Sequence, residues 1–201
     1  MKKTLASIVL LLGTIGAAEA SGLDLALSNE TANLSLLLNP YPLTGGGGSE
    51  LAVGGFISEA GDNILHATLM ARGYRQSATS QYNLAAGLKA LGGQIEVDEN
   101  NVLPDEDDET VGALALGMQA GLLLASSKYN PMELSFEAFY APSITSFSDA
   151  ENYAEVAARF QVEIIPQARA YIGYRRMQFD TNDFENVSLD RSIHIGLKIT
   201  Y

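Results

Sequence analysis

The sequence has no cysteine and no tryptophan among its 201 residues, and only 12 lysines and arginines stand against 24 acidic side chains. The missing cysteine excludes disulfides, thiolate-bound zinc, iron–sulfur clusters and thiol nucleophiles. A net charge of -12 disfavours nucleic acid as a partner, because such binding requires clustered basic side chains. The composition that remains, 47% hydrophobic and 18% charged, is typical of a folded chain of one domain.

The first twenty residues have the three parts of a secretory signal peptide. The start is basic (MKK), residues 5–16 are apolar and uncharged, and residues 18–20 (AEA) form a small-residue cleavage motif. A membrane anchor is the alternative, but a twelve-residue apolar stretch is too short to cross ~30 Å of hydrocarbon as a helix. We therefore expect residues 1–20 to be removed on export, which leaves residues 21–201 as one domain.

The last fifteen residues alternate between apolar and polar side chains. From 187 to 201, seven of the eight odd positions are apolar, Arg191 being the exception, and no even position holds a large apolar residue. A period of two is typical of a β-strand. The segment is longer than an ordinary globular strand and covers the ~9–11 residues that a tilted strand needs to cross a bilayer.

The same alternation recurs upstream, with one apolar face opposite a face of charged residues, histidine or glycine. It is found at 65–71, 82–88, 132–140, 154–164 and 170–174.

Two further segments have a helical alternative. Residues 110–127 carry no charge and are long enough for a membrane helix, and residues 148–160 open with Ser148 and Glu151, spaced as in a helix capping box. Large side chains at the even positions of 110–127 favour a strand there. We predict strands for both segments.

Turn-forming residues separate these segments, and their connections differ in length. The links at 128–130 and 166–167 are short, whereas those at 94–109, 142–152 and 180–186 are long. Short turns at one end and long loops at the other are typical of outer-membrane barrels, in which they face the periplasm and the exterior respectively.

The strand count follows from these boundaries. Eight strands are counted from 51 to 201, and residues 22–39 add a hairpin that turns at Asn29-Glu30. Outer-membrane barrels of this kind have an even number of strands. The predicted fold class is therefore all-β, an antiparallel up-and-down transmembrane β-barrel of ten strands, with eight strands as the alternative.

A soluble barrel also alternates, but it turns its apolar face inward, whereas a membrane barrel turns that face toward lipid. Most of the segments are nine residues or longer, and the chain ends on an aromatic residue, as the insertion signals of outer-membrane proteins do. Tyrosines also lie near segment ends, where an interfacial girdle is expected, although the absence of tryptophan counts against it. These tyrosines are Tyr82, Tyr140, Tyr153, Tyr174 and Tyr201.

Five stretches resemble the YfaZ family of outer-membrane proteins. They are 139–150 (FYAPSITSFSDA), 165–176 (IPQARAYIGYRR), 194–198 (HIGLK), 27–32 (LSNETA) and 59–63 (EAGDN). The resemblance covers nearly the whole chain after the signal peptide, and it is most specific in the C-terminal half. It implies a small outer-membrane barrel and brings no catalytic motif to this sequence.

An acidic loop at 94–110 is predicted to be extracellular. Eight carboxylates lie between 96 and 109, but a calcium loop starting at Asp98 fails because Val102 and Leu103 occupy positions that need an oxygen ligand and a glycine. We predict no cofactor and no specific metal site. The alternative is weak divalent-cation association that bridges the barrel to lipopolysaccharide, through Asp105, Glu106, Asp107, Asp108 and Glu109.

The polar face carries the candidate lumen residues. His66 and His194 share it, but no hydrolase motif accompanies them, and Ser192 near His194 is too little to define a dyad, so no catalytic residue is predicted. Isolated charges inside a barrel are costly, and we expect Glu155 or Glu137 to pair with Arg159, Arg169 or Arg175. The predicted lumen charges are Lys89, Glu133, Glu137, Glu155, Arg159, Glu163, Arg169 and Arg175.

These observations favour a non-enzymatic barrel with a structural or interaction role and a lumen filled largely by side chains, since barrels of eight to ten strands leave little interior space. A narrow, cation-preferring channel for small solutes is the alternative, and an outer-membrane enzyme is a remote third. The expected partners are outer-membrane lipid and lipopolysaccharide, and the barrel-insertion machinery through the C-terminal strand that ends at Tyr201.

Overall fold

The computed structural model describes residues 21–39, 47–76, 81–96, 108–125, 130–182, 184 and 186–201. The expected signal peptide, residues 1–20, lies outside these residues. The described chain forms eleven β-strands and one short 3-10 helix, η1 (Ser143–Thr145). The strands are β1 (Gly22–Leu27), β2 (Thr31–Leu38), β3 (Gly48–Ser58), β4 (Asn63–Gln76), β5 (Gln81–Glu96), β6 (Asp108–Ala125), β7 (Met132–Ala141), β8 (Ser146–Ser148), β9 (Ala150–Ile165), β10 (Ala168–Thr181) and β11 (Val187–Thr200).

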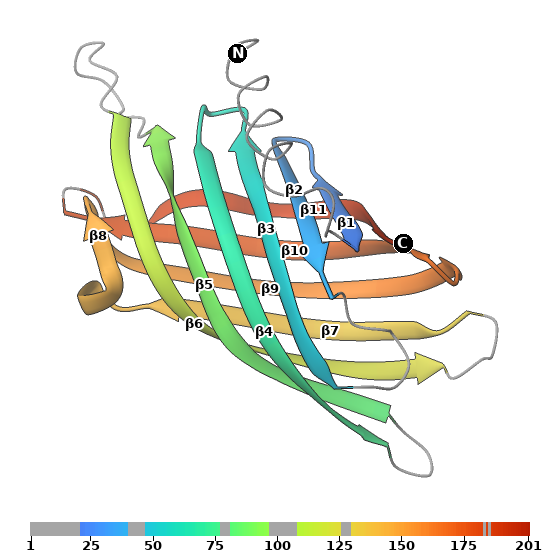
Figure 1. Ribbon diagram of the computed structural model, residues 1–201. Helices are drawn as coiled ribbons and strands as arrows, with labels where there is room; N and C mark the ends of the chain where they lie inside the picture. The colour runs from blue at the N-terminus through green and yellow to red at the C-terminus, as the bar shows by residue number, and fades with distance from the viewer. Residues whose placement is uncertain are drawn as a thin grey trace.

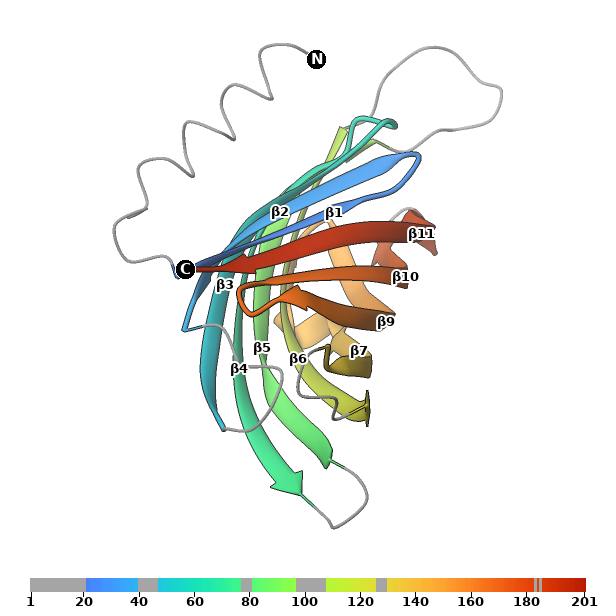
Figure 2. The ribbon, with the colours of Figure 1, turned by 90° about the vertical axis from the view of Figure 1, so that its right-hand side faces the viewer.

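Ten of these strands form a closed antiparallel barrel. Each pairs with its neighbours in chain order, and β1 pairs with both β2 and β11, which closes the ring (Figures 1 and 2). The eleventh strand, β8, lies outside the ring and pairs with β6. The predicted ten-stranded barrel is confirmed, including the hairpin that turns at Asn29-Glu30, and the eight-stranded alternative is wrong.

Both segments with a helical alternative are strands. Residues 110–125 of the first segment lie in β6, which pairs with β5 from Asp108 to Leu123, and most of residues 148–160 lie in β9. The period of two, which places large side chains on one side of β6, outweighs helix signals such as the Ser148–Glu151 spacing. In the part of the chain that the structure describes, no helix has the length and hydropathy needed to cross a membrane.

The barrel has two distinct ends. At the terminus end, the backbone N–H of Tyr201 donates to the carbonyl of Ser21 at 3.0 Å, and the two-residue turn 166–167 joins β9 to β10. The loop end carries the other set of connections, which are 28–30, 59–62, 97–107, 142–149 and 182–186.

The acidic connection is shorter than the predicted 94–110. The ladder of β5 and β6 continues through the pair Gln94↔Thr110 to Glu96↔Asp108. The side chain of Ile95 is completely buried there, so apolar burial extends both strands into the region that the acidic composition assigned to a loop.

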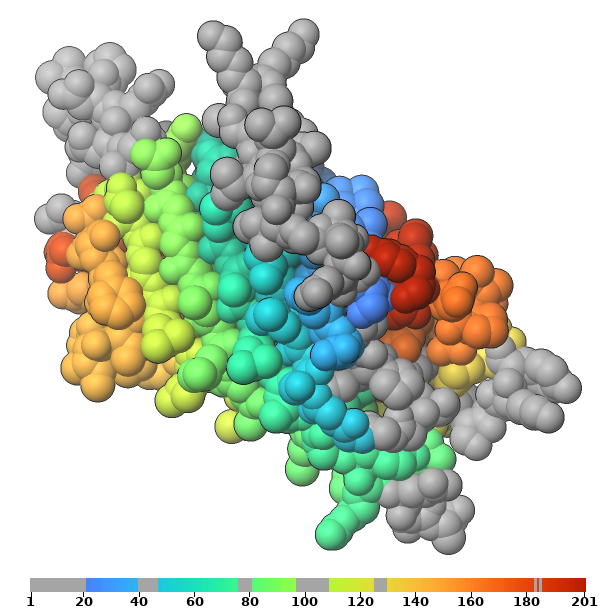
Figure 3. All heavy atoms as spheres, in the orientation of Figure 1, coloured from blue at the N-terminus to red at the C-terminus, as the bar shows by residue number. Residues whose placement is uncertain are grey.

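Many of the large apolar side chains of the barrel face outward, as predicted. Leu116 and Met118 are each 68% exposed, and Ile193 and Ile195 are 65% and 64% exposed. Lys89, by contrast, is buried on the inner face. Figure 3 shows the outer face over β3 to β6, where these strands pack side by side. We refer to this outward apolar surface as the belt. It includes Leu69, Leu84, Leu88, Leu114, Leu116, Met118, Phe136, Val156, Ile172, Ile193 and Ile195.

The alternation of the last strand fails at its beginning. A β-bulge shifts the register between Met177 and Gln178, so that Met177 pairs with Asp190 and Gln178 with Ser188. An extra residue in one strand moves the following side chains to the opposite face. Leu189 is therefore buried inside the barrel, and Val187 packs against the same interior cluster. The prediction that both belong to the outward apolar face is wrong.

The interior at the loop end is filled by apolar side chains. The rings of Tyr153 and Phe179 lie 4.8 Å apart and both are completely buried. The placement of Tyr153 in an interfacial girdle is wrong, because the odd positions of β9 face inward. Tyr82, Tyr140, Tyr174 and Tyr201 are exposed. We call this cluster the loop-end plug: Phe56, Ile64, Leu91, Ile95, Val111, Phe139, Tyr153, Met177, Phe179 and Leu189.

A glycine provides the space for one ring of the plug. Gly117 pairs with Phe139 in the β6–β7 ladder, and a Cβ at Gly117 would lie 2.1 Å from that ring. The aromatic ring therefore covers the glycine, which any larger residue at position 117 would prevent.

Candidate functional site in the barrel interior

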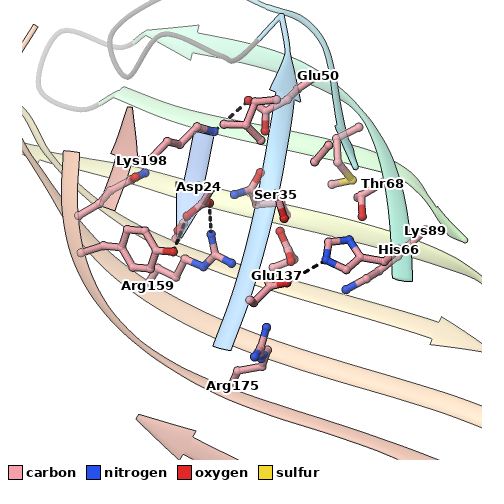
Figure 4. Close-up of a pocket in the computed structure, with 18 of the residues that line it drawn as sticks. Asp24, Ser35, Glu50, His66, Thr68, Lys89, Glu137, Arg159, Arg175 and Lys198 are labelled. Atoms are coloured by element: carbon pink, nitrogen blue, oxygen red, sulfur yellow. Dashed lines mark hydrogen bonds and ion pairs between the residues drawn. The ribbon is translucent and has the colours of Figure 1, made fainter. Parts of the chain in front are cut away.

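Between the loop-end plug and the terminus end, the barrel holds a polar cavity of about 110 Å³. A volume of this size accommodates several water molecules or one small solute. Its lining comes from most of the strands (Figure 4). The charged and imidazole side chains that line it are Asp24, Glu50, His66, Arg72, Lys89, Glu137, Glu155, Arg159, Arg169, Arg175 and Lys198.

Two buried ion pairs lie directly below the plug. The ammonium group of Lys89 donates to Glu155, which also accepts a hydrogen bond from the hydroxyl of Tyr153 at 2.6 Å. The guanidinium of Arg175 contacts Asp190 at 2.6 Å. Because Tyr153 belongs to the plug, the hydrogen bond to Glu155 joins the apolar and the charged layers of the interior.

Four further pairs extend toward the terminus end. Their N–O distances are 3.2 Å for Arg72 with Glu133, 3.3 Å for Arg159 with Asp24, 3.7 Å for Arg169 with Glu163 and 2.9 Å for Lys198 with Glu50. Figure 4 shows that the Asp24 and Glu50 pairs converge on the cavity.

The aromatic ring of Tyr171 lies across Gly196, where a Cβ would approach it to 2.1 Å, and its hydroxyl donates to Asp24. Asp24 is thus held by a hydroxyl as well as by the guanidinium of Arg159.

All eight predicted lumen charges lie on the inner face of the barrel, but their partners differ from those expected. Glu155 pairs with Lys89 and not with an arginine, and Arg159, Arg169 and Arg175 pair with carboxylates other than Glu137 and Glu155. Within the described residues, Glu137 makes no hydrogen bond and no ion pair. The expected pairings are wrong because the partners lie on strands that the alternation alone does not bring together.

Five charged residues of the interior were missed as candidates. Arg72, Asp190 and Lys198 lie on the same polar faces as the predicted residues, so the alternation was sufficient to find them. Asp24 and Glu50 lie on β1 and β3, where the apolar and polar positions alternate less cleanly. Twelve of the described interior charges form six ion pairs, to which Glu137 and Glu109 do not belong.

The two histidines on the inner face differ in their hydrogen bonding: one ring nitrogen of His66 has a partner, whereas neither ring nitrogen of His194 has one among the described residues. Nε2 of His66 lies 2.9 Å from the side-chain oxygen of Asn33, and the ring of His194 contacts the Tyr171 ring edge-on, with centroids 5.9 Å apart. The hydroxyl of Ser192 donates a hydrogen bond to Asp190, and it therefore does not form a catalytic dyad with His194.

The loop end holds a separate set of carboxylates that connect its strands. Asp62 accepts hydrogen bonds from the Ser58 hydroxyl at 2.7 Å and from the backbone N–H of Glu96 at 3.1 Å. Burial raises the pKa of Asp62, and these two hydrogen bonds oppose the rise. Asp149 accepts from the backbone N–H of Thr110 at 3.1 Å. These hydrogen bonds join the connections at the loop end to the neighbouring strands β5 and β6.

Most of the acidic run suggested to bind cations lies outside the described residues. Asp105, Glu106 and Asp107 lie outside the described residues, and Asp108 begins β6. Glu109 is buried on the inner face of that strand. Among the described residues, no group of three or more histidine or acidic side chains is arranged to hold a metal ion.

One family model and two solved structures are similar to this chain. A family model described as YfaZ precursor matches residues 1–201, whereas no curated protein matches. Two solved structures are similar at 11% identity and a TM-score of 0.40 each. One is the NanC porin, with 90% of this chain and 100% of that chain covered. The other is the outer membrane protease OmpT from Escherichia coli, with 91% and 94% covered.

Proposed function

This chain belongs to the YfaZ family, and from that membership and the outward belt we propose that it is an integral outer-membrane β-barrel with a structural or interaction role. Its lumen is filled largely by its own side chains. The proposal includes export through the signal peptide 1–20, insertion guided by the C-terminal strand that ends at Tyr201, and no enzymatic activity.

The belt supports the membrane location. From Ile193 on β11 to Tyr201, which directly follows this strand, apolar residues occupy every second position on the outer side. This length matches the ~9–11 residues of a tilted membrane strand. A continuous apolar surface of this extent is not stable in water. A barrel wall that faces lipid tails, by contrast, has to be apolar. The end with the termini and the two-residue turn 166–167 then faces the periplasm, and the end with the longest connections faces outward.

The loop-end plug is the observation that carries the filled-lumen proposal. An ion path along the barrel axis has to pass Phe56, Tyr153 and Phe179, all of which are buried and packed within one cluster. The cavity of about 110 Å³ below it favours the second candidate, a narrow channel. Charge does not support a strong cation preference in the lumen, since most of the described interior charges are neutralised in six ion pairs.

Membrane insertion predicts heat-modifiable migration. Purified protein in dodecyl sulfate is expected to run faster on an unheated gel than after boiling, because a closed barrel keeps its hydrogen-bonded wall in detergent. The full-length protein is also expected in the outer-membrane fraction. Recovery of a folded chain from the soluble periplasmic fraction, without detergent, contradicts the proposal.

The filled lumen predicts electrical silence. Purified protein inserted into a planar lipid bilayer is expected to give no unitary current steps over a wide voltage range, with insertion checked by protease protection of the barrel. Regular steps with a defined conductance favour the channel candidate instead.

A further inference from the structure

Basic side chains are rare on the outside of this barrel. Of the 12 lysines and arginines, six are in the interior ion pairs. Lys2, Lys3 and Lys128 lie outside the described residues. The remaining three, Arg75, Arg176 and Arg191, are exposed on the outer face.

Two of these three arginines are direct neighbours. Arg176 of β10 and Arg191 of β11 occupy opposite positions in the ladder. Side chains at opposite positions are separated by only ~4.5–5.5 Å at their Cβ atoms, and like charges placed there destabilise a sheet. Arg191 is also the residue that interrupts the apolar alternation of the last strand.

Neither guanidinium has a carboxylate within ion-pair distance among the described residues. Nε of Arg176 donates to the side-chain oxygen of Gln178 at 3.0 Å, which leaves its charge uncompensated. The exposed acidic residues of the loop end, such as Glu30, Glu59 and Glu151, form no ion pair with Arg176 or Arg191. The sheet therefore places two positive charges together without a protein counter-ion.

The pair lies at the border of the belt on the loop-end side. The next outward residues toward the terminus end are Tyr174 on β10 and Ile193 on β11, and both belong to the exposed apolar surface. In a bilayer, this border is the level at which hydrocarbon meets the headgroups of the outer leaflet. An anionic group at this level supplies the missing counter-ion.

We infer that Arg176 and Arg191 together bind a phosphate group of an anionic lipid headgroup in the leaflet on the loop-end side, the phosphorylated glycolipid of lipopolysaccharide. Two guanidinium groups offer the paired donors that phosphate oxygens accept. The inference rests on the proposed membrane location, and it assigns the lipid contact to two arginines rather than to divalent ions held by the acidic loop.

The test compares Arg176→Gln, Arg191→Gln and the double variant with Arg75→Gln, which removes an outward arginine near the opposite end of the barrel. Full-length protein in neutral detergent is titrated with fluorescent lipid A, with and without its phosphates. Each single variant is expected to weaken binding of the phosphorylated form about 5–10-fold and the double variant more, while Arg75→Gln stays within about twofold. Chelator should leave wild-type binding intact.

Several results overturn the inference. They are equal binding of dephosphorylated lipid A, an unchanged affinity of the double variant, or loss of wild-type binding in chelator. If inorganic phosphate alone at millimolar concentration competes fully, the claim that the bound phosphate belongs to a lipid is contradicted. Heat-modifiable migration of every variant shows that the barrel is intact, so that a failed lipid site is distinguished from a failed membrane-barrel proposal.

Discussion

Replacement of Lys89 by methionine is expected to lower the free energy of unfolding by about 3–5 kcal/mol, because it leaves the carboxylate of Glu155 buried without its cation. The side chain of Glu155 is 4% exposed and that of Lys89 is 10% exposed, so water does not replace the lost partner. Methionine keeps an apolar side chain close to the ring of Phe139, which the Lys89 ammonium approaches to 5.3 Å. The measurement is urea titration of the barrel in lipid vesicles, followed by gel migration of the folded form.

A second substitution distinguishes an unpaired charge from lost packing. Lys89→Met combined with Glu155→Gln removes both charges and keeps an acceptor for the Tyr153 hydroxyl, so more than half of the lost stability is expected to return. The matched control is Lys198→Met. Its pair with Glu50 is more accessible, with side chains 14% and 15% exposed, and it is expected to cost roughly half as much or less. Equal losses in the two single variants contradict this account.

Removal of two rings from the plug is expected to convert a silent barrel into a conducting one. Tyr153→Ala combined with Phe179→Ala deletes the two buried rings that pack at 4.8 Å, and it opens the cavity toward the loop end. Each deletion is expected to cost about 3–5 kcal/mol of stability. The measurement is single-channel recording in planar bilayers, with current steps expected from the double variant and none from the wild type.

The control removes a ring of the same size from the opposite face. Phe136 is 56% exposed on the belt, so Phe136→Ala is expected to leave the barrel silent. Phe56→Ala, at another buried position of the plug, provides a second opening variant if the double variant does not fold. Silence of both opening variants, when their heat-modifiable bands are intact, shows that the plug is not the barrier.

The eight predicted lumen charges show how far sequence reasoning reaches into the site. Each was identified because it alternates with apolar neighbours on its own strand, and each lies inside the barrel. Alternation depends only on neighbouring residues of one strand. Alternate side chains therefore face the same side of the folded barrel unless a β-bulge shifts the register. At Leu189 a bulge does intervene, and the sequence gives no sign of it because leucine fits either face.

The sequence by itself determined where the barrel strands lie and which of their side chains share a face, because a period of two is imposed by the geometry of a single extended chain. The tertiary structure decided which charges meet. Asp24 and Arg159 are 135 residues apart, and Glu50 and Lys198 are 148 apart. Contacts across a lumen depend on how the closed ring staggers its strands, and that stagger exists only once all ten strands have paired.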